Sequence, residues 1–334
     1  QVFLFRKDNA GGIQERHCAV LLRNLESDGV CAGGLGAQIR NYGIGNEIEK
    51  GIAMGHGKLK KFSENETFAC LLQPDSSEIL AGKEPGAAFS HSPLVLKDHP
   101  VKGRWNERMF GGRDCPIVLE LGCGKGEYTV DLALRNPGMN YVGVDIKGAR
   151  MWKGAKQATE GNIVNAAFLR TRIEFVEAFF APGEVSEIWL TFSDPQMKSE
   201  NSRLVSPMFL ERYRKFLKPG GVVHLKTDST FLFEYARAVC SANGLKVLAC
   251  TSDLYAGDRE AMRGSALASV CGPDAVDALF EVQTFYEKNF LKQGFKINYI
   301  SFTIDREGDF VYPDFDAAYW RAAEAPRFLP GHQF

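Results

Sequence analysis

The stretch Ile117-Val-Leu-Glu-Leu-Gly-Cys-Gly-Lys-Gly126 decides the fold class. A short apolar run ends in glycines at every second position, and a helical stretch follows to Arg135. Glycine tolerates positive φ and lets a ligand approach where a Cβ would otherwise stand. The following helix points its free N–H groups toward that ligand. Asp145 ends the next apolar run, 19 residues after Gly126, where it can bind a ribose hydroxyl pair. These residues therefore predict a ligand site at a strand-to-helix turn.

Apolar runs of strand length alternate with helical stretches beyond this motif. The expected strands are 117–121, 140–144, 167–169, 187–192, 221–227, 245–251 and 297–304. Strands that alternate with helices of about 10–15 residues form βαβ units and a parallel sheet. The last two runs can close the sheet as an antiparallel pair. We therefore predict an α/β fold with a mostly parallel seven-stranded sheet, helices on both faces and a late antiparallel strand.

The spacing of the glycines separates two kinds of ligand. A dinucleotide fingerprint reads GxGxxG and places a helix N-terminus at a pyrophosphate. Here the third glycine comes one residue early, and Glu120 precedes the first. A carboxylate repels a pyrophosphate, whereas it attracts the ammonium and sulfonium groups of S-adenosylmethionine. We therefore favour S-adenosylmethionine over a nicotinamide or flavin dinucleotide.

A second motif, Glu187-Ile-Trp-Leu-Thr-Phe-Ser-Asp-Pro-Gln-Met-Lys198, places Asp194 at the carboxyl end of a strand. Substrates of open α/β sheets bind at this edge. Asp-Pro is also ordinary turn chemistry, so this motif alone leaves a simple loop open. Beside the glycine motif it marks Asp194 as a candidate active-site acid.

The charge of the chain is balanced overall but not locally. The 334 residues include 40 Lys+Arg and 41 Asp+Glu, a formal net charge of −1, which by itself is unfavourable for a nucleic-acid binder. Residues 147–172 nevertheless hold six basic groups and one acidic group, and residues 196–218 hold six and two. We expect these clusters to follow phosphates near the substrate edge.

Cysteine usage and hydropathy exclude other classes. None of the eight cysteines forms a CxxC pair, and no histidine cluster lies near them at zinc-ligand spacing, so we predict no metal site. This pattern favours a reduced, cytoplasmic compartment. No apolar run approaches the ~18–20 residues that cross a bilayer, so we expect no membrane association.

Five motifs together resemble the bacterial tRNA (guanine-N7-)-methyltransferases of the TrmB type. They are Leu119–Glu127, Gly143–Lys147, Phe192–Pro195 with Lys198, Leu225–Asp228, and Thr284–Glu287 with Gly294. The resemblance runs from about Met54 to Ile304. It implies four segments: a Gly-rich, poorly ordered extension (1–53), a basic arm and irregular lead-in (54–114), a Rossmann-like class I methyltransferase domain (115–310) and a C-terminal tail (311–334).

The resemblance also implies an activity and roles for individual residues. The activity is methyl transfer from S-adenosylmethionine to N7 of a guanine in tRNA, by resemblance the variable-loop guanosine at tRNA position 46, with S-adenosylhomocysteine as the other product. The implied cofactor contacts are Glu120, Gly122, Gly124, Gly126, Asp145 and Asp194, and Asp194 is also the implied catalytic acid. The implied tRNA or guanine contacts are Lys198, Asp228, Thr284, Phe285, Tyr286 and Glu287.

The chain departs from the family pattern at three places. Ser193 stands where proline is common, residues 196–203 lack a dense basic run, and Arg172 takes the approximate place of an acid that often contacts the donor. Because residues 196–203 carry few basic side chains, this loop should bind phosphates more weakly than the loops of its relatives. Two alternatives therefore stay open, a methyltransferase for a small molecule or protein and a non-catalytic RNA-binding relative. A monomer and a homodimer are both compatible with the sequence.

Overall fold

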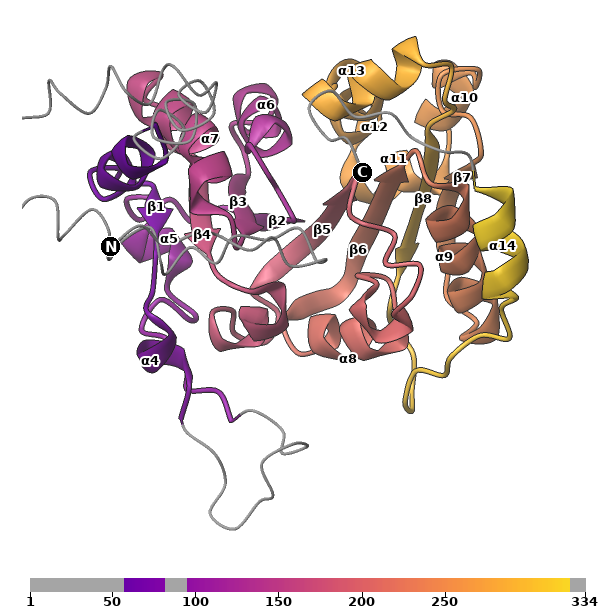
Figure 1. Cartoon of the computed structure of the whole chain (residues 1–334), viewed down its shortest axis with the longest axis horizontal. Helices are drawn as coiled ribbons and strands as arrows, with labels where there is room; N and C mark the ends of the chain where they lie inside the picture. The colour runs from indigo at the N-terminus through magenta and orange to yellow at the C-terminus, as the bar shows by residue number, and fades with distance from the viewer. Residues whose placement is uncertain (1–56, 82–94, 325–334) are drawn as a thin grey trace, which may run out of the picture. The chain divides into compact units, whose positions relative to one another are not determined.

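The computed structural model describes residues 57–81 and 95–324 (Figure 1). From Lys60 onward the described chain belongs to one compact unit. The extension expected at residues 1–53 lies outside the described residues. No helix in the described ranges is both long and apolar enough to span a membrane.

The elements follow the predicted alternation of strands and helices. Residues 57–65 are helical. The strands are β1 (Leu71–Leu72), β2 (Ile117–Leu121), β3 (Asn140–Asp145), β4 (Ala166–Arg170), β5 (Val185–Thr191), β6 (Leu217–Thr227), β7 (Val247–Thr251) and β8 (Asn298–Thr303). The α-helices are α4 (Ser76–Ile79), α5 (Trp105–Arg108), α6 (Glu127–Arg135), α7 (Gly148–Glu160), α8 (Pro207–Arg214), α9 (Thr230–Ala242), α10 (Arg259–Arg263), α11 (Ala266–Cys271), α12 (Pro273–Glu281), α13 (Phe285–Lys292) and α14 (Ala317–Ala323). Two 3₁₀ turns are η1 (Ile173–Ala178) and η2 (Glu200–Ser202).

The strands form one sheet in the order β1-β4-β3-β2-β5-β6-β8-β7 (Figure 1). The first six strands of this order are parallel, and β8 lies antiparallel between β6 and β7. All seven predicted strands are present, which confirms the mostly parallel α/β sheet. The predicted count of seven was wrong by one, because β1 pairs with the edge of β4 through only two residues. Two residues are too few to show a strand periodicity.

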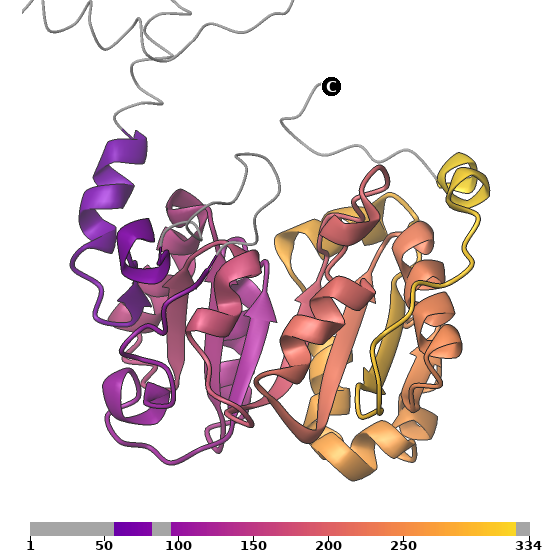
Figure 2. The ribbon, with the colours of Figure 1, turned by 90° about the horizontal axis from the view of Figure 1, so that it is seen from below.

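Both faces of the sheet are apolar, as expected for parallel strands covered by helices. Alternate residues of β2 point to opposite faces: Leu119 and Leu121 belong to one buried cluster, and Val118 belongs to the other. Residues of α8, α9 and η1 cover the first face, whereas those of α6, α7, α11, α12 and α13 cover the second. Figure 2 shows the sheet between these two layers.

The lead-in before β2 packs on the same core as the sheet. Ile79 and Trp105 are buried in the first cluster, and the indole N–H of Trp105 donates to the carbonyl of Phe179 at 2.8 Å. Asn65, at the end of the first helix, donates to the carbonyl of Gly148 at 3.0 Å. The lead-in therefore supports the sheet near the start of α7.

Candidate active site

The strand order fixes where a ligand can bind. The chain runs outward from β2 through β3 to β4 on one side, and from β5 to β6 on the other. Ligands of open α/β sheets bind at the carboxyl ends of the strands where this order reverses. Here that position lies between the ends of β2 and β5, which carry the glycine loop and the loop with Asp194.

The glycine loop contains three glycines with positive φ, at +83° for Gly122, +55° for Gly124 and +70° for Gly126. A Cβ on Gly126 would lie 2.5 Å from a ring carbon of Phe168, so this glycine lets α6 pack closely on the sheet. A Cβ on Gly122 would meet no atom within 4 Å. Gly122 therefore leaves open space beside the loop, and this is the place where the backbone can approach a ligand.

Asp145, at the end of β3, holds the glycine loop in place. Its carboxylate accepts hydrogen bonds from the N–H of Gly124 at 2.9 Å and from the N–H of Lys147 at 2.8 Å. These bonds fix the loop against the start of α7. The carboxylate is half-buried and keeps acceptor capacity for a ribose hydroxyl pair.

Glu120 lies beneath the glycine loop and is almost completely buried. One carboxylate oxygen accepts from the backbone N–H and the hydroxyl of Thr129, at 2.9 and 2.5 Å. The other accepts from the hydroxyl of Thr191 at 2.5 Å. Burial raises the pKa of Glu120 to about 7, although these hydrogen bonds oppose the shift. An ammonium group nearby would favour the ionised form, so the residue fits the amino-acid end of S-adenosylmethionine.

The loop after β5 presents Asp194 in a constrained backbone. Phe192 and Gln196, on either side of it, have φ of +52° and +46°, which is rare outside glycine. Such strain persists only where the surroundings impose it, and it clusters at functional sites. The Asp194 side chain is exposed and accepts the N–H of Gln196 at 3.0 Å. Its other carboxylate oxygen, Oδ2, keeps acceptor capacity for a substrate.

Two arginines donate hydrogen bonds to the backbone of the loop after β5. Arg203 is buried, its guanidinium lies 4.3 Å from the centre of the Tyr235 ring, and it donates to the carbonyl of Gln196 at 3.4 Å. Arg321, from α14, donates to the carbonyl of Met197 at 2.8 Å. Arg203 belongs to the basic cluster 196–218, which we expected to follow phosphates. That expectation was wrong for this residue, because its side chain is enclosed and does not face solvent. No pattern in the sequence predicted that α14 reaches the loop.

The segment 284–286 reaches the glycine loop from the far end of the chain. Thr284 caps α13, and the N–H of Phe285 donates to a carboxylate oxygen of Glu127 at 2.9 Å. The ammonium of Lys125 lies 4.1 Å from the centre of the Phe285 ring. Lys125 and Glu127 were missed as site residues, although both belong to the glycine motif and were available there.

Glu287 is enclosed and paired with a lysine. Its side chain is fully buried and forms a 2.8 Å ion pair with Lys226 of β6, which is buried as well. Tyr255 donates to the same Glu287 oxygen at 2.6 Å. The other carboxylate oxygen, Oε2, is buried and has no hydrogen-bond partner among the described residues. The implied substrate contact of Glu287 stays a prediction. The ion pair with Lys226 anchors the segment 284–286.

Lys198 and Asp228 lie at the same edge as Asp194. Lys198 is exposed on the loop after β5, and Asp228 directly follows β6, the strand next to β5. The two therefore flank Asp194 from its own loop and from the neighbouring strand.

Ion pairs reduce the expected basic surface. Of the twelve basic groups in the two clusters, six form pairs with acidic side chains: Lys153, Lys156, Arg172, Arg203, Arg214 and Lys215. Exposed pairs of this kind are worth little and open readily. Phosphate binding here should therefore be weaker and more salt-dependent than the count of basic residues suggests.

These features define the class of protein. The glycine loop lies at the switch point, and Asp145 stands at the end of β3. The exposed Asp194 lies across the switch point. This arrangement matches a class I S-adenosylmethionine-dependent methyltransferase. Residues 114–262 match a family model described as putative methyltransferase.

Relatives identify the family. A tRNA (guanine-N(7)-)-methyltransferase of Bacteroides thetaiotaomicron is 45% identical over 78% of this chain and 91% of the relative. Proteins of the same name from Bacteroides fragilis (43% identical, 79% of this chain and 92% of the relative) and Porphyromonas gingivalis (46%, 65% and 83%) are similarly close. The chain belongs to the tRNA (guanine-N(7)-)-methyltransferase family.

Proposed function

We propose that this chain transfers the methyl group of S-adenosylmethionine to N7 of a guanine in tRNA, in the cytoplasm, and that the guanine lies in the variable loop. The observation that carries the proposal is Asp194, held exposed by a strained loop across the switch point from the glycine loop. The names of the relatives support the same reaction.

The chemistry needs alignment and charge stabilisation more than proton transfer. Guanine N7 carries a lone pair and no proton, so no general base has to act on it. S-adenosylmethionine supplies a methyl group on a positively charged sulfur, and the charge moves to the purine as the methyl is transferred. A carboxylate at the guanine stabilises that change, since it interacts most strongly when the charge has arrived.

Each residue has a role in this reaction. Asp194 accepts hydrogen bonds from the N1–H and exocyclic amine of the guanine and turns N7 toward the methyl group. Glu120 and Asp145 hold the amino-acid and ribose ends of the donor, with Gly122 giving the backbone access. Lys198 binds tRNA phosphate beside the reacting base.

Two substitutions at one position test the role of Asp194. Asp194→Asn keeps an oxygen for the N–H of Gln196 but removes the charge, whereas Asp194→Ala removes both. We expect kcat for labelled methyl transfer to unmodified tRNA to fall ~10²–10³-fold in Asp194→Asn, with unchanged donor affinity. Asp114→Asn, just before β2 at the opposite edge of the sheet, is the matched control and should retain full activity.

The product and the binding data decide between the open alternatives. Nucleoside analysis of the tRNA should yield 7-methylguanosine. Donor binding without any transfer to tRNA would instead favour a small-molecule or protein methyltransferase, or a non-catalytic relative. Near-normal turnover in Asp194→Asn would refute the role given to this carboxylate.

A further inference from the structure

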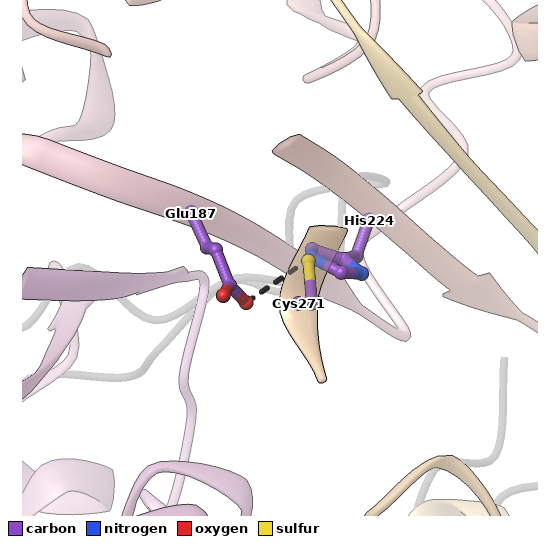
Figure 3. A group of neighbouring side chains, drawn as sticks. All are labelled: Glu187, His224 and Cys271. Atoms are coloured by element: carbon purple, nitrogen blue, oxygen red, sulfur yellow. Dashed lines mark ion pairs between the residues drawn. The ribbon is translucent and has the colours of Figure 1, made fainter. Parts of the chain in front are cut away.

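Three potential metal ligands converge far from the residues of the methyl-transfer site. Glu187 lies near the start of β5, His224 on the neighbouring β6, and Cys271 is the last residue of α11. Their ligand atoms all lie within 4.8 Å of one another (Figure 3). The Nε2 of His224 is 3.2 Å from a carboxylate oxygen of Glu187. The three residues are well separated in the sequence, which is why the cysteine and histidine spacing gave no indication of them.

His224 is buried, and its two ring nitrogens face Glu187 and Tyr299. His224 is 0% exposed, and its Nε2 has no aligned hydrogen-bond partner although it faces Glu187. Its other nitrogen, Nδ1, is 2.8 Å from the hydroxyl of Tyr299. The imidazole therefore lies between an acidic side chain and a hydroxyl group. A metal ion at this place could be bound by Nε2 and by the Glu187 carboxylate together.

Neighbouring side chains fix the orientation of two of the potential ligands. Trp189 stacks on the His224 ring at 4.0 Å between centroids, and its indole N–H donates to Glu187 at 3.2 Å. Tyr299 holds the second ring nitrogen of His224. Metal-binding histidines and carboxylates are held by such outer partners in the same way.

The donor set is of a kind that binds zinc. A thiolate, a carboxylate and a neutral imidazole are the ligands of zinc, and the two anionic groups neutralise its charge. Metal binding by a thiol displaces its proton. A small void of about 20 Å³, lined by Glu187, Cys271 and Asp274 among others, has room for about one water molecule.

We propose that Glu187, His224 and Cys271 bind a zinc ion, with a water molecule in the fourth position. The ion joins β5 and β6 to α11, so it fastens the helices that cover this face of the sheet. Glu187 precedes Asp194 by seven residues along an extended chain, at the other end of β5, so the ion takes no part in methyl transfer.

Cobalt(II) is the probe, because a cobalt–thiolate bond gives a charge-transfer absorption band that other ligands do not. The untagged full chain, freed of metal by a chelator, is titrated with Co²⁺ and then with Zn²⁺. We expect a thiolate band that saturates at one equivalent and disappears when Zn²⁺ displaces the cobalt. Cys250→Ser, at an exposed cysteine of β7, is the matched control and should keep the band. Cys271→Ser should abolish it.

A second variant distinguishes loss of metal binding from loss of folding. Glu187→Gln keeps the size of the side chain and an oxygen for Trp189, and it should weaken metal binding at least tenfold. Zn²⁺ should raise the Tm of the metal-free wild type and should raise that of Glu187→Gln much less. Absence of the cobalt band in the wild type, or a band of full intensity in Cys271→Ser, would overturn the proposal.

Discussion

The buried pair of Lys226 and Glu287 offers a sharp test of how the segment 284–286 is held. Both side chains are 0% exposed, and their charged atoms are 2.8 Å apart. The ammonium also donates to the carbonyls of Leu279 and Val282, at 2.7 and 3.1 Å. Burial lowers the pKa of Lys226, and the nearby carboxylate opposes that shift. The pair therefore joins β6 to the end of α12 and to α13.

Removal of one partner leaves the other charge enclosed. In Lys226→Met, the Glu287 carboxylate keeps only the hydrogen bond from Tyr255, and the carbonyls of Leu279 and Val282 lose a donor. The loss of one partner from a buried pair costs about 3–5 kcal/mol. We expect that loss in the free energy of unfolding, measured by urea denaturation at pH 7. Methyl transfer should fall as well, because the segment 284–286 loses its anchor.

Two further variants complete the experiment. Lys218→Met carries the same substitution at an exposed position of β6 and should change stability by less than ~0.5 kcal/mol. The double variant Lys226→Met/Glu287→Gln should lose less than the sum of its single variants, because neither then leaves a full charge unpaired. If Glu287→Gln keeps its full stability while KM for tRNA rises, Glu287 contacts the substrate and the anchoring role is refuted.

Three other predictions concern the donor pocket and the loop behind it. The pKa of Glu120 is about 7, above its ordinary value of 4.5, so its contribution to stability is complete below pH 4.5 and is lost as the pH rises to about 7. The loss is at most about 3 kcal/mol, and urea denaturation at several pH values should find it absent in Glu120→Gln. An equal dependence of stability on pH in both proteins would contradict this prediction. Gly126→Ala places a Cβ 2.5 Å from Phe168 at a φ of +70°. This should lower the free energy of unfolding, measured by urea denaturation, by ~2–5 kcal/mol. A variant of wild-type stability would show that the loop is not constrained there. Arg321→Ala removes the hydrogen bond to Met197 and should lower kcat by up to ~100-fold, with little change in stability or donor affinity. An unchanged kcat would mean that α14 does not position the loop.

Much of the fold was predictable because its signals are local. Apolar runs of strand length and the glycines after β2 depend on a few consecutive residues, and all seven expected strands are present. The strand β1 was missed because two residues carry no periodicity. At the site, Gly122, Gly126 and Asp194 were predicted from turn chemistry and from the edge at which parallel strands end, and their roles stay predictions. Arg321 was not, because nothing in the composition of the tail shows which loop it meets.

The sequence by itself therefore determined a mostly parallel α/β sheet, its glycine loop and the edge of the sheet at which Asp194 lies. Only the tertiary structure decided that Glu287 is enclosed with Lys226, that Arg203 supports the active-site loop, and that Glu187, His224 and Cys271 meet. The physical reason is that backbone conformation follows from neighbours in the chain. The partner of a buried charge instead follows from packing between segments that lie far apart in the sequence.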